Sequence, residues 1–214
     1  MRDEGRSDSE VFEAFGGVRH TPPLPRAVSK AVRELLARLD ATERKHASDV
    51  SFYAMMICET LDVPAALMRQ VVTAGMLHDI GKVAIPVTER IHPGDLTDYE
   101  RLNMRTHPEI GEAMTSVHPV LEPYAPLIRH HHERYDGAGY PDGLKGSGLP
   151  FGAAVLAMAE SFATMITEQP YRPARTWHGA LAELRHGSGT QFHPTTVRGF
   201  LIALGEMPAS ASRR

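Results

Sequence analysis

The stretch Gly75-Met76-Leu77-His78-Asp79-Ile80-Gly81-Lys82 decides how this chain can fold and what it can bind. The run 71–77 is apolar on nearly every side of a helix, which predicts a buried helix. It ends in the pair His78 and Asp79, whose side chains point about 100° apart on a helix of about 3.6 residues per turn. The pair can therefore offer a nitrogen and a carboxylate to one cavity, as a metal ion requires. The alternative is a helix that simply ends, with Asp79 in solvent and Gly81 as its C-terminal stop.

Length and composition set the broad class of the protein. A chain of 214 residues fits one domain with a tail. The net charge of −3 leaves no overall basic field, which argues against DNA or RNA as a partner. Cys58 is the single cysteine, so no internal disulfide can form, and no apolar run reaches the ~20 residues of a membrane span. We therefore expect a cytoplasmic protein without a membrane span. The 12 histidines are the unusual feature, because histidine is the commonest metal ligand.

Apolar periodicity predicts an all-α domain, since no stretch alternates as a strand would. A capping box begins a helix at Thr97, and Pro108 breaks or restarts that helix. Thr42 is a plausible N-cap for the second helix. The other helices are predicted over 26–39, 43–61, 64–77, 123–132, 152–167, 174–186 and 194–204.

The chain divides into three parts. Residues 1–25 form a flexible leader that closes in a proline-rich boundary, residues 26–204 form the domain, and residues 205–214 form a frayed tail. The leader leaves no room for a receiver or sensor domain, so we expect a stand-alone protein or a fragment of a longer one. Residues 133–150 form a long loop rich in Gly and Pro, and such a loop inside a compact domain is more often functional than filler.

Several polar side chains fall on the inner faces or at the ends of the predicted helices. Each has an ordinary explanation: a hydrogen-bonded core histidine, a solvated helix end, or a carboxylate paired with an arginine. Together they are hard to explain in that way, because a mixed nitrogen and oxygen set of this size suits two metal ions of the Fe or Mn type. The set is His46, His78, Asp79, His107, His131, His132 and Glu160.

Four segments resemble those of a known family. They are HDIGK at 78–82, HPEIG at 107–111, HHERYDGAGYP at 131–141 and GTQFHP at 189–194. Together they are similar to the HD-GYP domain, a branch of the HD phosphohydrolases, and the resemblance covers residues 26–204. It implies an all-α HD-superfamily bundle with C-terminal extension helices. It also implies hydrolysis of the bacterial second messenger cyclic di-GMP to pGpG, or onward to GMP.

The resemblance implies a role for each matching residue. Asp79 is expected to bridge two divalent ions, Fe or Mn, and Lys82 to contact the scissile phosphate; these two are the expected catalytic residues. Arg172 matches a basic position near the ligand phosphates. Cyclic di-GMP is the expected substrate, and GGDEF-type cyclases or other signalling proteins are possible partners. The pocket-shaping loop residues are Gly139, Tyr140 and Pro141, and the metal ligands are His46, His78, Asp79, His107, His131, His132 and Glu160.

The chain departs from the family pattern around the last ligand and the phosphate-binding positions. Glu160 stands where the family has Asp, Ala163 replaces a second Asp, and Gln169 replaces an Arg, which should weaken phosphate binding. Thr42 stands where trinuclear members have Glu. Because Glu43 is one position off and should face about 100° away, a binuclear site is favoured.

Two other departures are His193 in place of Asp and Asp49 in place of Arg. These changes motivate an alternative function. In it the domain is catalytically degenerate and acts as a nucleotide sensor or protein-interaction module. A third interpretation, a nucleotide phosphohydrolase of the wider HD superfamily, does not require the segment 131–141.

Overall fold

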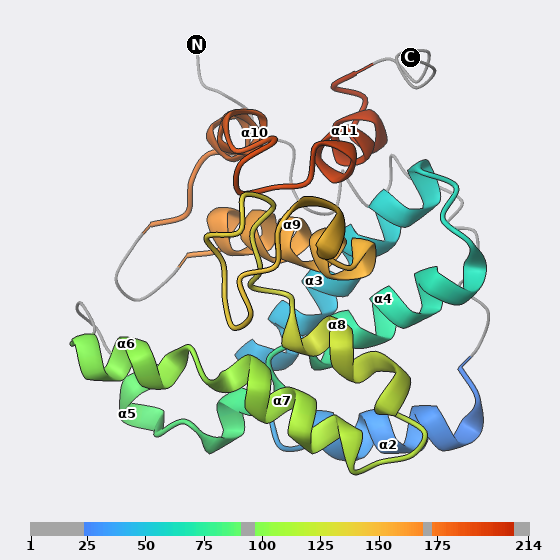
Figure 1. Cartoon of the computed structure of the whole chain (residues 1–214), viewed down its shortest axis with the longest axis vertical. Coiled ribbons are helices and arrows are strands. Elements are labelled where there is room, and N and C mark those ends of the chain that lie inside the picture. The colour runs from blue at the N-terminus through green and yellow to red at the C-terminus, as the bar shows by residue number, and fades with distance from the viewer. Residues whose placement is uncertain (1–23, 91–96, 169–172, 208–214) are drawn as a thin grey trace.

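The computed structural model describes residues 24–90, 97–168 and 173–207, and in these parts the chain is built from helices (Figure 1). The predicted all-α class is confirmed. Within the same residues the strand-like structure is limited to an isolated bridge between Ser188 and Phe192. Gln169 and Arg172, together with most of the predicted leader and tail, lie outside the described residues. In the described parts, no helix combines the length and the apolar character needed to cross a bilayer.

The α-helices are α2 (Arg26–Leu36), α3 (Ala41–Thr60), α4 (Ala65–Leu77), α5 (Val87–Arg90), α6 (Asp98–Met104), α7 (His107–Ser116), α8 (Ala125–Arg129), α9 (Phe151–Ile166), α10 (Trp177–His186) and α11 (Pro194–Ala203). Short 3-10 helices are η1 (Ile80–Ala84), η2 (Glu122–Tyr124) and η3 (Gly146–Gly148).

The N-cap of α3 is Asp40, so the prediction of Thr42 was wrong. The Asp40 side chain accepts from the Glu43 backbone N–H at 2.8 Å, and the Glu43 carboxylate accepts from the Asp40 N–H at 2.9 Å. A capping box needs an acidic or amide side chain three residues after the cap, and Asp40 has one while Thr42 does not. Glu43 therefore caps the helix that carries His46.

The helix predicted over 123–132 is wrong at both ends. A 3-10 turn, η2, precedes it, and α8 ends at Arg129. The Ile128 carbonyl is within 2.6 Å of His131 Nδ1, so a side chain takes the acceptor that a continuing helix would give to a backbone N–H. Leaving the helix lets two adjacent rings, those of His131 and His132, face one region.

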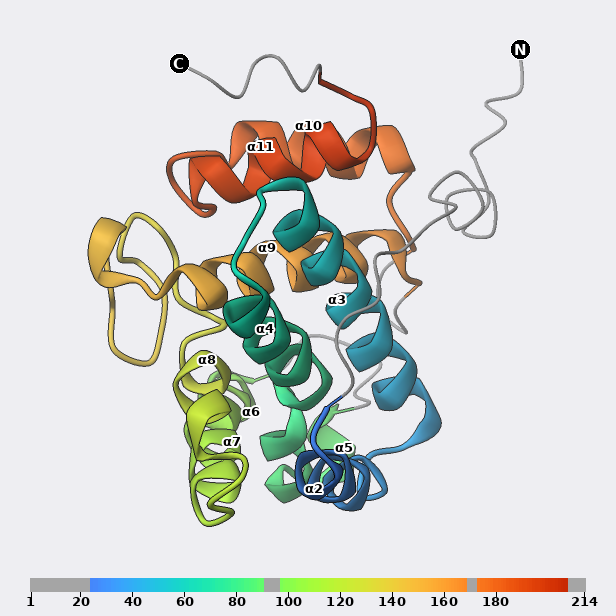
Figure 2. The same ribbon diagram turned by 90° about the vertical axis from the view of Figure 1, so that its right-hand side faces the viewer.

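Helices α3 and α4 pack side by side, and α9 packs against both (Figures 1 and 2). Beyond α9, α10 and α11 cover one end of the domain, while α7 and α8 pack together near α4 (Figure 2). Phe162 of α9 makes edge-to-face contacts with Tyr53, Trp177 and Phe200, at ring-centroid distances of 5.1, 5.0 and 4.7 Å. Such pairs each contribute about 0.5–1.5 kcal/mol beyond their buried area, so they fix α9 against its neighbours.

Gly81 lets η1 and α7 approach closely. A Cβ at this position would lie 2.0 Å from the His107 carbonyl oxygen and 2.7 Å from the Gly111 backbone nitrogen. Only a residue without a side chain fits there. Gly81 is thus a contact point between two elements, and the interpretation of it as a helix stop was wrong.

Candidate metal centre

His78 and Asp79 follow the last residue of α4 and are buried, with 0% and 3% of their surfaces exposed. The alternative of a solvated Asp79 is therefore wrong. Burying a carboxylate is costly unless cations or donors surround it. The neighbours of Asp79 consequently decide what this part of the chain can do.

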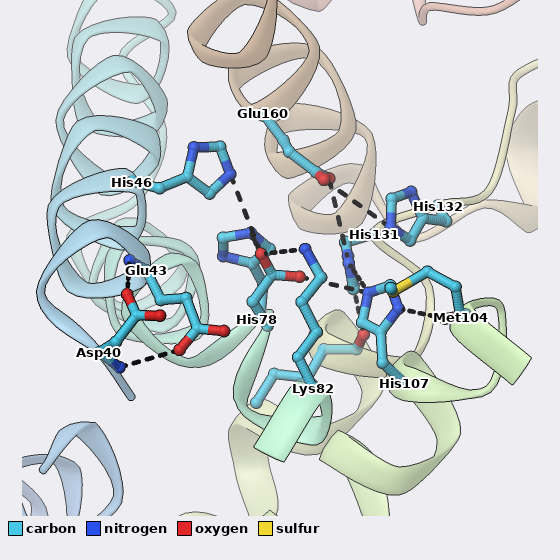
Figure 3. A network of polar contacts seen from close by, with 12 residues as sticks. Asp40, Glu43, His46, His78, Lys82, Met104, His107, His131, His132 and Glu160 are labelled. Atoms are coloured by element: carbon cyan, nitrogen blue, oxygen red, sulfur yellow. Dashed lines mark hydrogen bonds and ion pairs between the residues drawn. The ribbon is translucent and has the colours of Figure 1, made fainter. Parts of the chain in front are cut away.

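Side chains from several helices meet in one cluster (Figure 3), and Asp79 lies within it. His46 Nε2 lies 4.0 Å and His78 Nε2 lies 3.2 Å from Asp79 Oδ2. His107 Nε2 lies 3.3 Å from Asp79 Oδ1. His46 comes from the middle of α3 and His107 is the first residue of α7. Asp79 is thus the carboxylate that these imidazoles share.

Glu160 of α9 closes the other side of the cluster. Its Oε2 lies 3.9 Å from His131 Nε2, and its Oε1 lies 3.7 Å from His132 Nε2. Burial raises the pKa of Glu160 to about 7. The longer side chain of this departure from the family pattern still reaches the histidines, so the predicted ligand position is kept in space.

Three imidazoles each make the same kind of local hydrogen bond, which fixes the tautomer of the ring. Nδ1 of His78, His107 and His131 lies 2.7, 2.7 and 2.6 Å from the carbonyl of the residue three positions earlier. A carbonyl can only accept, so Nδ1 carries the proton in each ring. Each Nε2 then directs a lone pair into the cluster, and such orientation by an outer hydrogen bond is typical of metal-binding histidines.

These lone pairs face other hydrogen-bond acceptors instead of donors. A metal ion fits such a site only if its atoms lack protons to share, as the following contacts show. His107 Nε2 and His131 Nε2 are 3.2 Å apart. His78 Nε2 and Asp79 Oδ1 are buried without a hydrogen-bond partner in the described part of the chain. Burial, reinforced by neighbouring imidazoles, holds the pKa of His131 well below its usual value, which disfavours a second proton. A metal cation is the group that satisfies this arrangement, so the residues fit one.

Among the described residues, the possible ligand atoms form three groups, each with its atoms within 4.8 Å of one another. Asp79 and His131 each belong to two groups, so neighbouring ions could share them. The groups are His46 with His78 and Asp79, His107 with His131 and His132, and Asp79 with His131 and Glu160. Every residue predicted as a metal ligand is in one of these groups.

The charges keep Asp79 ionised. Burial opposes its ionisation, but His78 and Lys82 outweigh burial and hold its pKa well below the usual value. Lys82 Nζ donates to Asp79 Oδ2 at 2.7 Å, and 25% of the Lys82 side chain is exposed. Burial and then the neighbouring His78 lower the pKa of His46 to about 4, so its ring is neutral at pH 7. The centre thus combines the ionised Asp79 with a neutral His46 and with Lys82.

Glu133 holds the signature loop in place, a role that the sequence did not indicate. This buried carboxylate accepts the backbone N–H groups of Asp142, Gly143 and Leu144 at 2.7, 2.9 and 3.1 Å. Gly139 lies so close that a Cβ there would be 2.5 Å from Glu133 Cα. Glu133 is within the quoted motif, but its contacts depend on the path of the loop.

Tyr140 and Arg105 extend the centre toward solvent. The Tyr140 ring stacks on His132, with centroids 4.8 Å apart and planes at 22°. The guanidinium carbon of Arg105 lies 4.4 Å from the centroid of the Tyr140 ring. Arg105 is exposed and has no carboxylate partner in the described part of the chain. Sequence reasoning missed Arg105, because its contact with Tyr140 depends on the path of a loop that follows it in the chain.

Comparisons with known proteins agree with this geometry. A sequence profile described as an HD domain matches residues 30–196. The cyclic di-GMP phosphodiesterase response regulator RpfG of Xanthomonas campestris pv. campestris is 36% identical over 183 residues, which cover 81% of this chain and 48% of that protein. A cyclic di-GMP phosphodiesterase of Thermotoga maritima is 34% identical, over 76% of this chain and 45% of that protein.

The chain thus spans about half the length of the curated relatives that it matches. Among solved structures, Bd1817, an HDG"Y"P protein from Bdellovibrio bacteriovorus, superposes with a TM-score of 0.65 at 16% identity, over 92% of this chain and 67% of that one. At this identity the likeness concerns the fold alone.

Proposed function

The chain belongs to the HD domain family, in its HD-GYP branch, and from this premise we propose that it is a metal-dependent phosphodiesterase that hydrolyses cyclic di-GMP to pGpG. The observation that carries the proposal is the cluster of buried acceptor atoms around Asp79, in which the Nε2 atoms of His107 and His131 lie 3.2 Å apart. Relatives that are 36% and 34% identical are named cyclic di-GMP phosphodiesterases, which supports this substrate.

Two divalent ions, Fe or Mn, are the proposed cofactors, because these metals accept imidazole and carboxylate ligands together. Asp79 would bridge them. When bound, the ions supply Lewis-acid activation of the phosphodiester and of the attacking water. One ion would be held by His46, His78 and Asp79, and the other by His107, His131 and His132, with Glu160 completing the set.

The side chains around the ions position the substrate. Lys82, fixed by its 2.7 Å contact with Asp79, donates to a non-bridging oxygen of the scissile phosphate and offsets its growing charge. Arg105, held over Tyr140, offers a second cation at the edge of the centre. Arg172, outside the described residues, remains a further predicted phosphate contact.

The degenerate-sensor alternative is not favoured, because the proposed ligands converge despite the change to Glu at position 160. A cytoplasmic location and GGDEF-type cyclases or other signalling proteins as partners stay predictions. The same holds for the limits of the domain at residues 26 and 204.

The test is anaerobic purification, metal analysis, and turnover of cyclic di-GMP with added Mn²⁺ or Fe²⁺. We expect two ions per chain and accumulation of pGpG. A chain that carries two ions and leaves cyclic di-GMP intact would contradict the proposal and favour the sensor alternative.

A further inference from the structure

A cavity of about 310 Å³ adjoins the metal centre. One wall is made of His131, His132 and Glu160, so the cavity opens directly onto the proposed ligands. Arg175, which precedes α10, and Glu183, which belongs to α10, also line the cavity. The chemistry described so far uses neither of these two residues.

Apolar side chains also line the cavity. Ala157 and Met165 of α9 and Phe192 line it, and Met165 and Phe192 are buried. Sites for small ligands are largely apolar, hold a few fixed polar groups, and have volumes of about 300 Å³ or more. A cavity of this size next to a phosphodiester centre has room for a nucleobase attached to the bound phosphate.

The polar groups on the rim are held in place by the fold. Arg175 Nη1 donates to Glu183 Oε2 at 3.0 Å, and the Arg175 backbone N–H donates to the Met165 carbonyl at 2.8 Å. Gln191 also lines the cavity, and its carbonyl accepts the Tyr135 N–H at 3.2 Å. In the described residues its side-chain amide makes no hydrogen bond. Gln191 belongs to the segment GTQFHP, to which the proposed chemistry gives no role.

We propose that this cavity binds one guanine base of the substrate, an inference that rests on the proposed phosphodiesterase function. Guanine presents the acceptors O6 and N7, which an arginine can contact as a pair. It also presents the donors N1–H and N2–H, which a carboxylate can accept together. Arg175 and Glu183 offer these complementary groups side by side, and Gln191 donates to or accepts from the remaining edge. Adenine lacks both O6 and the paired donors, so the cavity selects against it.

Base selectivity is measured by calorimetric binding of GMP and of AMP to the Mn²⁺-loaded chain. The wild type should bind GMP at least about tenfold more tightly than AMP, the scale of one bidentate base contact. Glu183→Gln should remove most of that preference, and Gln191→Ala should weaken GMP binding. Equal affinity of the wild type for the two nucleotides, or a preference that survives Glu183→Gln, would overturn the inference.

Glu206→Gln is the matched control. Glu206 pairs with Arg185 of the same helix α10 at 2.9 Å and does not line the cavity. The substitution Glu206→Gln removes an equivalent surface ion pair outside the cavity, so this variant should keep the GMP preference. If Glu206→Gln also lost the preference, the assignment to the cavity would be overturned.

The inference and the proposed function fail separately. Bis(p-nitrophenyl) phosphate is a phosphodiester without a nucleobase, so its hydrolysis by the wild type reports on the metal centre alone. Hydrolysis without base preference would overturn only the guanine cavity. A preference for GMP without hydrolysis of bis(p-nitrophenyl) phosphate or of cyclic di-GMP would overturn only the catalytic proposal.

Discussion

At the scale of single residues, the centre depends on side chains whose local bonds leave one ring nitrogen for a ligand. His107 begins α7 and donates from Nδ1 to the Met104 carbonyl, which belongs to the preceding helix α6. His131 donates to the Ile128 carbonyl inside α8. Each imidazole is therefore aimed by the end of a helix beside it. The resulting orientation does not depend on a bound ion.

Asp79→Ala should abolish turnover and leave the helices intact. The substitution removes the carboxylate shared by the imidazoles and the anchor of Lys82, so we expect activity to fall by about a thousandfold or more. A cyclic di-GMP assay and far-ultraviolet circular dichroism measure the two effects. Asp98→Ala, at an exposed position of α6, is the control. Full activity in Asp79→Ala would contradict the assignment of Asp79 as a catalytic residue.

Arg105→Gln should raise KM for cyclic di-GMP by about tenfold, the value of one charge-assisted contact of about 1.4 kcal/mol. Its guanidinium lies over Tyr140 and has no acidic partner in the described part of the chain, so a substrate phosphate can occupy it. Steady-state kinetics measure the change, and Arg105→Lys should recover part of it. Arg33→Gln, which removes an exposed arginine of α2, should keep the wild-type KM. An unchanged KM in Arg105→Gln would contradict the role.

At the scale of elements, Gly81→Ala should separate η1 from α7. The added Cβ would lie 2.0 Å from the His107 carbonyl, so one element must move. We expect the free energy of unfolding to fall by about 3 kcal/mol and metal affinity to fall with it. Urea denaturation and metal titration measure both.

Gly148→Ala is the control for that change, because a Cβ there meets nothing within 4 Å. Its stability should stay within about 0.5 kcal/mol of the wild type, as for an ordinary surface substitution. Equal effects of the two substitutions would refute the close approach of η1 and α7.

The cap of α11 gives a pH dependence. His193 Nδ1 accepts the Thr195 N–H at 3.1 Å, so the cap needs the unprotonated nitrogen. Burial lowers the pKa of His193, so the folded state binds fewer protons than the unfolded state below about pH 6.5, and stability is lost as pH falls through that range. An aspartate cap stays ionised there. The His193→Asp variant should therefore become more stable relative to the wild type as the pH falls from 7.5 to 5.5. The quantity compared is the free energy of unfolding of each protein. A constant difference in chemical denaturation would contradict this.

The sequence predicted the elements where local periodicity decides them. The helix expected over 152–167 is α9 (Phe151–Ile166), because one continuous apolar face must be buried. It did not predict the end of α8, where the His131 side chain competes with the backbone for the Ile128 carbonyl. The predicted ligands came together because motif spacing fixes their elements. Arg105 and Glu133 were missed, because their roles arise from contacts with a loop that follows them in the chain.

At the scale of the whole molecule, the centre links helices that come from separate parts of the chain. The candidate ligands come from α3, the end of α4, α7, the turn after α8, and α9 (Figure 3). An ion bound among them contacts the folded state and finds no such site in the unfolded chain. Metal binding should therefore be linked to the stability of the entire domain.

Metal removal tests this linkage through two neighbouring histidines. Adding Mn²⁺ at a hundredfold its Kd to the chelator-stripped chain should raise the free energy of unfolding by about 2.7 kcal/mol. His131→Ala should lose most of this gain, because His131 belongs to two of the candidate ligand groups. His130→Ala should keep it, because His130 Nε2 instead contacts Asp142 at 2.8 Å. Urea denaturation with and without Mn²⁺ measures the gain for each variant. If Mn²⁺ stabilised His131→Ala as much as the wild type, the ions would not lie where the acceptor atoms converge.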